Sequence, residues 1–421
     1  TGIQNTFIGG LAGDANTTAS NNTAVGYLSL SANTLGNENV SVGALALDAN
    51  TIGSQNTAMG HNALSENTTA SFNTALGRQA LRDNTTASNN TAVGFNALLA
   101  NTTGADNVAI GSRTLDANTT GESNTAVGKG SLSANTTASN NAAFGANTLL
   151  VNTTGGSNTG LGHGALAANT TASSNTAVGK SALLANTTGA SNTAVGKSAL
   201  SANTTASNNT AVGSAALDTN TTGSQNVAVG FAALDANTTG GNNVAVGMSA
   251  LDANTTADNN TAIGYEALTV NTTGASNTAV GLQSLAANTT GNNNTAVGRS
   301  ALTANTTGLN NAGLGESALS GVTTGDNNVG IGINAGFTLT TGSANVIIGK
   351  NANVSTNSHS NTIIIGEDVT GVGADNFTFG HSTTDSNIAF GATSITAPSD
   401  VRLKEDIQDE EVGLNFVNDL R

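Results

Sequence analysis

The feature that most constrains this chain is a repeat of seventeen residues that continues through most of its 421 residues. Every seventeenth residue from Asn5 to Asn345 is Asn, and we number each repeat from this Asn as position 1. Position 4 is always apolar, position 5 is always Gly, position 9 is usually Leu and position 12 is usually a second Asn. A short fixed period with few apolar residues is typical of a solenoid, in which each coil contacts only its neighbours.

Seventeen residues are too few for a helix–turn–helix unit but suffice for two short strands and two turns. Positions 1 to 4, usually Asn-Thr-Ala-Val, predict a strand, and we expect positions 2 and 4 to face the interior because position 4 is always apolar. Positions 8 to 11, Ala-Leu-x-Ala, predict a second strand with Leu in the core, and Asn-Thr-Thr-Gly is typical of a turn. The predicted fold is all-β, a parallel β-solenoid (β-roll) of 17-residue coils. Asp at Leu166 or Val178 is expected to disorder neighbouring coils.

Two further residue types carry structural information. The invariant Gly at position 5 predicts a positive φ or a backbone approach that leaves no room for a Cβ. Position 15 is Gly in some coils and Ala in others, such as Gly104 and Ala70, so it does not require a Gly-only conformation. The Asn side chains at positions 1 and 12 are expected to hydrogen-bond from coil to coil. With one Val and one Leu inside each coil the core is thin, which favours association with further copies, and we prefer a homotrimer.

The chain is expected to have three parts. Residues 1–321 hold the regular repeats, and in 322–398 the pattern loosens and the spacing of the Asn residues shortens, which predicts tapering coils. Residues 399–421 are charged and poor in Gly, which predicts a short C-terminal helix. Since Thr1 already lies in the repeat register, we expect an N-terminal part to be missing.

Composition excludes several function classes. The net charge of −15 argues against a nucleic-acid partner, and the lack of Cys excludes disulfides and thiolate metal sites. No apolar run approaches the length of a membrane span. The four His residues lack a second ligand at metal spacing, so we predict neither a metal site nor a cofactor. Asp residues recur at position 10, for example Asp48 and Asp235, and are interpreted as a solvated edge rather than a catalytic row.

Two segments resemble known families. Residues 399–407, Ser-Asp-Val-Arg-Leu-Lys-Glu-Asp-Ile, resemble the start of the intramolecular chaperone domain of endosialidase-type phage tailspikes and tail fibres. The repeat Asn-Thr-Ala-Val-Gly-x-x-Ala-Leu resembles the heads of trimeric autotransporter adhesins and the repeat shafts of phage tail fibres, and in both families the roll is trimeric. The chaperone resemblance implies self-cleavage at Pro398–Ser399, with Ser399 as the attacking hydroxyl and Lys404 as its helper.

Position 6 is the most informative variable position. It holds charged, aromatic and small residues, which predicts an outward row, and it carries six of the eight basic residues before Ser399. Aromatic and basic side chains on one stripe are suited to stacking on glycans and hydrogen-bonding to them, and the alternative is a solubilising or inter-chain row. The candidate binding residues are Tyr27, Phe95, Phe231 and Tyr265.

These observations predict an extracellular structural protein, the shaft of a trimeric phage tail fibre that carries host attachment and bears a C-terminal chaperone segment. Its expected partners are two further copies, other tail components and a host-surface glycan or protein receptor, with no catalytic turnover. The alternative is a bacterial cell-surface adhesin or filament built from the same roll. An ice-binding solenoid is a remote option, because that function normally needs two outward Thr on each strand.

Overall fold

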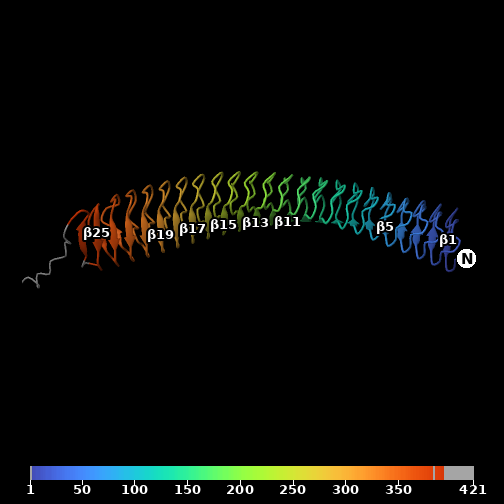
Figure 1. Ribbon diagram of the computed structural model, residues 1–421, viewed down its shortest axis with the longest axis horizontal. Coiled ribbons are helices and arrows are strands. Elements are labelled where there is room, and N and C mark those ends of the chain that lie inside the picture. Colours follow the sequence, from blue (N-terminus) through green and yellow to red (C-terminus); the bar gives the residue numbers. More distant parts are fainter. Residues whose placement is uncertain (1, 383–384, 393–421) are drawn as a thin grey trace, which may run out of the picture. The chain divides into compact units, whose positions relative to one another are not determined.

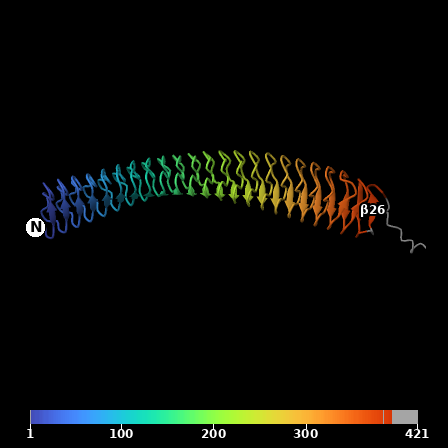
Figure 2. The same ribbon diagram turned by 180° about the vertical axis from the view of Figure 1, so that it is seen from behind.

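The computed structural model describes residues 2–382 and 385–392, and these are all-β with no helix. They form a parallel β-solenoid of about 22 turns of about 17 residues, which confirms the predicted fold (Figures 1 and 2). The chain divides into two units, residues 1–283 with 287–290 and residues 284–286 with 291–421, which are considered separately below. The helix predicted in 399–421 lies outside the described residues.

In the first unit every coil contributes one three-residue strand from positions 2 to 4. Each strand pairs in parallel with the strand of the next coil, so that Thr176 lies opposite Thr193 and Val178 opposite Val195. The strands are β1 (Thr6–Ile8), β2 (Thr23–Val25), β3 (Val40–Val42), β4 (Thr57–Met59), β5 (Thr74–Leu76), β6 (Thr91–Val93), β7 (Val108–Ile110), β8 (Thr125–Val127), β9 (Ala142–Phe144), β10 (Thr159–Leu161), β11 (Thr176–Val178), β12 (Thr193–Val195), β13 (Thr210–Val212), β14 (Val227–Val229), β15 (Val244–Val246), β16 (Thr261–Ile263) and β17 (Thr278–Val280).

The second unit begins with coils of the same 17-residue kind and then departs from this pattern. Its strands are β18 (Thr295–Val297), β19 (Ala312–Leu314), β20 (Val329–Ile331), β21 (Val346–Ile348), β22 (Asn353–Val354), β23 (Ile363–Ile365), β24 (Thr370–Gly371), β25 (Asn376–Phe379) and β26 (Ser386–Ala389). β22 and β24 form a separate two-stranded sheet, and β26 pairs antiparallel with β25. The antiparallel pair ends the run of parallel strands in this unit.

The predicted strand faces are reversed. From the second coil of the first unit onward, position 3 is fully buried, and the apolar residue at position 4 points outward. Met59 is 43% exposed and Leu161 is 48% exposed, so the prediction that position 4 lies in the core is wrong. The prediction for position 9 is confirmed, because Leu166 and its counterparts are fully buried. Ala at position 3 points toward this Leu. Because successive side chains of a strand point to opposite faces, the larger residues at positions 2 and 4 point outward.

Compensating residues show why position 3 is small. In the first coil Phe7 occupies position 3 and Gly13 replaces the Leu at position 9, where a Cβ would lie 2.6 Å from the Phe7 ring. In the second unit Gly336 replaces that Leu, and its Cβ would lie 2.9 Å from Ile347 at position 3 of the next coil. In both cases a large side chain at position 3 is matched by Gly at position 9. The interior of the coil therefore has room for one large side chain from these two positions.

The second strand predicted at positions 8 to 11 is absent from the regular coils of the first unit. Instead, positions 7 and 9 have positive φ, as in Leu28 (φ 55°) and Leu30 (φ 53°), and the segment runs through successive turns. Alternate left-handed residues are incompatible with an extended strand. The backbone still bonds to the next coil, since the Leu30 N–H donates to the Ala46 carbonyl over 3.0 Å.

Both predictions for Gly are confirmed. Gly179 at position 5 has φ of +135°, and a Cβ there would lie 2.4 Å from the Gly196 carbonyl oxygen of the next coil. Position 15 does not adopt a positive φ in either Gly104 or Ala70, so Ala is tolerated there.

The two Asn columns form the predicted hydrogen-bonded ladders. The Asn39 N–H donates to Asn22 Oδ1 over 2.9 Å, and Asn50 Nδ2 donates to Asn33 Oδ1 over 2.9 Å. Within one coil Asn22 Nδ2 and Asn33 Nδ2 both donate to the Gly36 carbonyl, each over 2.9 Å. These amides are fully buried and have partners, so they stabilise the coils and are not available to a ligand.

Candidate binding surfaces

The outer face of the β-sheet in the first unit presents an apolar column. Position 4 is half-buried or exposed in every one of its coils, yet it holds Val, Ile, Leu, Met or Phe throughout and never a polar residue. Position 2, Thr or Val in most coils, borders this column on the same face. Contiguous apolar surface of this kind marks an interaction site rather than a solvated face. We call positions 2 and 4 of the first unit the sheet face.

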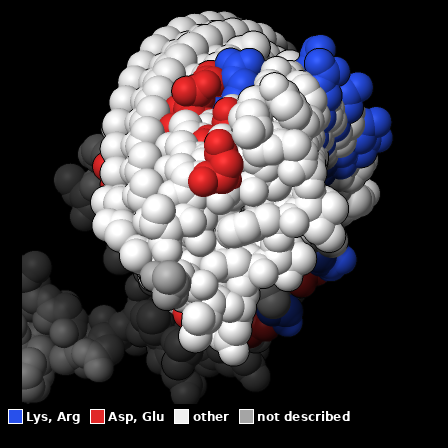
Figure 3. Space-filling model, turned by 90° about the vertical axis from the view of Figure 1, so that its right-hand side faces the viewer, with Lys and Arg blue, Asp and Glu red and all other residues white. Residues whose placement is uncertain are grey.

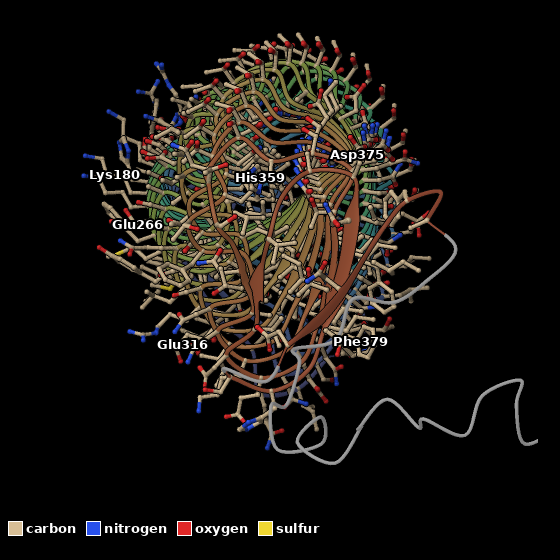
Figure 4. The ribbon with its side chains drawn as sticks, turned by 90° about the vertical axis from the view of Figure 1, so that its left-hand side faces the viewer. Lys180, Glu266, Glu316, His359, Asp375 and Phe379 are labelled. Carbon is tan, nitrogen blue, oxygen red and sulfur yellow. The ribbon has the colours of Figure 1, made fainter. Side chains whose placement is uncertain are left out.

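Position 6 forms a second outward surface, as the sequence predicts. Figure 3, which looks onto the N-terminal coils, shows Lys and Arg side chains gathered on one side, and Lys180 points outward on its side of the molecule in Figure 4. The four candidate binding residues are all exposed: Tyr27 by 58%, Phe95 by 39%, Phe231 by 57% and Tyr265 by 41%. The first unit therefore carries these residues on its surface, where they can meet a ligand.

The structure brings only some of these four residues together. Phe231 and Tyr265 lie two coils apart, whereas Tyr27 and Phe95 are several coils away. The guanidinium group of Arg78 lies 5.9 Å from the centroid of the Phe95 ring, so a cation–π contact already occupies one face of that ring. Two exposed residues of the same row, Met248 and Leu282, lie in the coils on either side of Tyr265. They were not selected from the sequence, although they occupy position 6 like the four candidates.

Tyr265 has a fixed polar neighbour. Its hydroxyl hydrogen-bonds to Glu266, which raises the pKa of Tyr265 and lowers the pKa of Glu266. Gln283 Nε2 of the next coil donates to Glu266 Oε2 over 2.9 Å. In Figure 4 Glu266 lies on the same outer side as Lys180. Oriented polar groups therefore stand directly beside the apolar residues of position 6.

The Asp residues at position 10, predicted to form a solvated edge, form a half-buried column. Asp218, Asp235 and Asp252 occupy the same position in three consecutive coils. Burial raises the pKa of Asp235, and the carboxylates of Asp218 and Asp252 on either side raise it further. Protonation of Asp235 is therefore more favourable in the folded chain than in the unfolded chain.

Asp235→Asn is expected to raise the thermal stability at pH 7 and to leave it nearly unchanged at pH 3. The folded chain binds the proton of the Asp235 carboxyl group more tightly than the unfolded chain does. Protonated Asp235 therefore contributes fully to stability below the ordinary pKa of 3.8, and this contribution is lost as the pH rises through the raised pKa. The neutral amide removes that loss. Melting curves of the variant and the parent between pH 3 and pH 7 test this, with Asn at the exposed Asp106 as the control. A constant difference across the range would contradict the prediction.

Three further predictions concern a metal site, a membrane span and self-cleavage. Within residues 2–382 and 385–392 no group of three or more His, Asp or Glu is placed to hold a metal ion. No helix there is long and apolar enough to cross a membrane. Ser399 and Lys404 lie outside the described residues. Self-cleavage stays a prediction, tested by mass spectrometry for a mature C-terminus at Pro398 that Ser399→Ala abolishes.

The chain matches no protein-family model and no curated protein sequence.

Proposed function

We propose that the chain is the shaft of a trimeric phage tail fibre that carries attachment to a host cell surface. The observation that carries the proposal is the sheet face, whose position 4 is apolar in every coil although it points outward. Position 6, also outward and only two residues further along, accepts Lys at Lys180 and Lys197. Solvent contact alone therefore does not explain position 4, and a partner that covers it along the coils does.

A second and third copy of the same chain fit this surface best. A partner must match one apolar residue every seventeen residues over many coils, and another copy has that spacing. When copies associate about a shared axis, each residue of the sheet face approaches its own counterpart. Two Val residues then attract each other, whereas two Lys residues repel, which accounts for the lack of charge at position 4. The number three rests on the resemblance to trimeric rolls.

The fibre function rests on the same features. A solenoid whose coils are joined by parallel strand pairing and by two columns of hydrogen-bonded Asn side chains is suited to holding other parts at a distance. The resemblance of residues 399–407 to a tailspike chaperone favours a virion over a cell. The chaperone segment would assist assembly of the three copies. The alternative, a bacterial surface adhesin or filament, uses the same trimer.

Antibodies against the purified chain are expected to label the tails of virions and to block their attachment to host cells. Light scattering of the purified chain is expected to give three times the chain mass of 41.0 kDa. Labelling of uninfected cell surfaces instead of virions would assign the chain to a cellular adhesin. A stable monomer at micromolar concentration would contradict the trimer.

A further inference from the structure

Four consecutive coils of the first unit carry a large, exposed and uncharged side chain at position 6. Phe231 is 57% exposed, Met248 46%, Tyr265 41% and Leu282 45%, and we call these four residues the apolar ridge. Elsewhere in this row large apolar side chains stand singly between small or charged ones, as Phe95 does between Arg78 and Ser112. Chance exposure of single apolar residues is normal, but a run over adjacent coils indicates a binding surface.

The ridge has a polar border that is already oriented. Glu266 and Gln283, one residue after Tyr265 and Leu282, are joined by a hydrogen bond of 2.9 Å, and the Tyr265 hydroxyl also bonds to Glu266. An aromatic and apolar platform beside fixed carboxylate and amide groups is the combination that binds the faces and the hydroxyls of sugars.

The spacing of the ridge selects an extended polymer. Hydrogen-bonded coils advance by about 4.8 Å, so the ridge offers one apolar contact per coil at that interval. This is comparable with the length of one β-linked pyranose unit. The four residues bear no charge, which favours a neutral chain over an anionic one.

An added peptide strand fits the ridge poorly, because the backbone carbonyls of its residues already have partners. The Phe231 carbonyl accepts from the Ser249 N–H over 3.0 Å, and the Tyr265 carbonyl accepts from the Gln283 N–H over 3.0 Å. Strand addition needs free backbone groups at an edge. A further copy of this chain is also a poor occupant, because the same row carries Lys180 and Lys197 in adjacent coils, and these would meet their own counterparts.

We infer that the apolar ridge binds a neutral, extended, β-linked glycan that lies along the coils with one sugar unit per coil. The inference rests on the proposed function, since it assigns the surface receptor of the fibre to this site. It excludes Tyr27 and Phe95 from the contact and adds Met248 and Leu282.

The composition of the chain provides a direct reporter. The sequence has no Trp and two Tyr residues, Tyr27 and Tyr265, so in a Tyr27→Phe variant the intrinsic fluorescence comes from Tyr265. Titration of this variant with cellohexaose or chitohexaose is expected to give a saturable change, and the α-linked, coiled maltohexaose is expected to give none. Phe231→Ala in the same background should weaken binding about tenfold or more.

Matched controls separate binding from folding. Phe72 is 57% exposed like Phe231 but lies at position 17, so Phe72→Ala is expected to leave the sugar affinity unchanged. Met248→Ser tests the ridge without changing an aromatic residue and should also weaken binding, with an unchanged melting curve in both ridge variants. A flat titration with both β-linked hexaoses, or equal losses in the Phe72 and Phe231 variants, would overturn the inference.

Failure of the ridge and failure of the fibre function are distinguishable. If fibres that carry Phe231→Ala and Met248→Ser still attach to host cells as the parent does, the ridge is not the receptor site, and the shaft function stands. If antibodies against the parent chain label no virion, the fibre function fails, and the hexaose titrations still decide whether the ridge binds a glycan.

Discussion

Leu166→Asp is expected to unfold the coils around it, whereas Val178→Asp is expected to leave the coil folded and to weaken the association of the copies. The Leu166 side chain is fully buried between coils, so a carboxylate there has neither water nor a partner, and the cost is about 4 kcal/mol or more. Val178 points outward on the sheet face, and in a single chain its replacement changes stability by about 0.5 kcal/mol.

Two measurements separate these effects. Far-ultraviolet circular dichroism should show a lower melting temperature and lost strand signal for the Leu166 variant, and a parent-like spectrum for the Val178 variant. Light scattering over a dilution series should then show that Val178→Asp dissociates into single chains at a higher concentration than the parent does. Val178→Thr, which adds no charge, should behave like the parent. Parent-like dissociation of Val178→Asp would show that the sheet face is not an interface. A loss of strand signal in both the Leu166→Asp and the Val178→Asp variants would restore position 4 to the core.

Gly179→Ala is expected to destabilise the first unit by about 3 kcal/mol or more, because its φ of +135° is strained for any residue with a Cβ and the added methyl lies 2.4 Å from a carbonyl oxygen. Gly189→Ala at position 15 is the matched control. An ideal Cβ there would lie 2.1 Å from the Ala206 carbonyl oxygen. Ala nevertheless occupies position 15 in Ala70 and Ala172, so the backbone accommodates it with a small shift and we expect a minor effect.

Urea denaturation of the two Ala variants beside the parent measures both changes. The midpoint should fall strongly for Gly179→Ala and little for Gly189→Ala. Equal falls would mean that the separation between coils, rather than the φ angle, determines where Gly is required.

Much of the solenoid was predictable from the sequence, because residues that recur at a fixed position meet the same backbone requirement in every coil. The invariant Gly, the two Asn columns and the buried Leu each follow from one physical requirement, and all three were predicted correctly. The strand faces were not, because hydrophobicity alone assigned Val178 to the core and ignored the small size of Ala177. Residue pairs held the missing signal: Phe7 with Gly13, and Ser41 with Ser29, whose hydroxyls lie 2.8 Å apart across the interior.

The absent second strand and the apolar ridge had weaker signals. Position 9 is Leu in eighteen consecutive coils and never Val or Ile, which fits a left-handed residue that β-branched side chains disfavour, but a core strand also favours Leu. The outward row at position 6 was predicted, whereas the ridge was not, because its identification depends on which coils stand side by side. Met248 and Leu282 gain their meaning from Phe231 and Tyr265, and from the exposed fraction of each side chain.

In the first unit most hydrogen bonds between coils join residues 16 to 18 apart, as in Leu30 to Ala46, Asn39 to Asn22 and Gly26 to Ile8. Each coil therefore recognises its immediate neighbours and nothing further away. A whole repeat can then be gained or lost by recombination within the gene while every junction stays native. Selection can therefore change the length of such a protein in steps of one coil, without a new fold having to evolve.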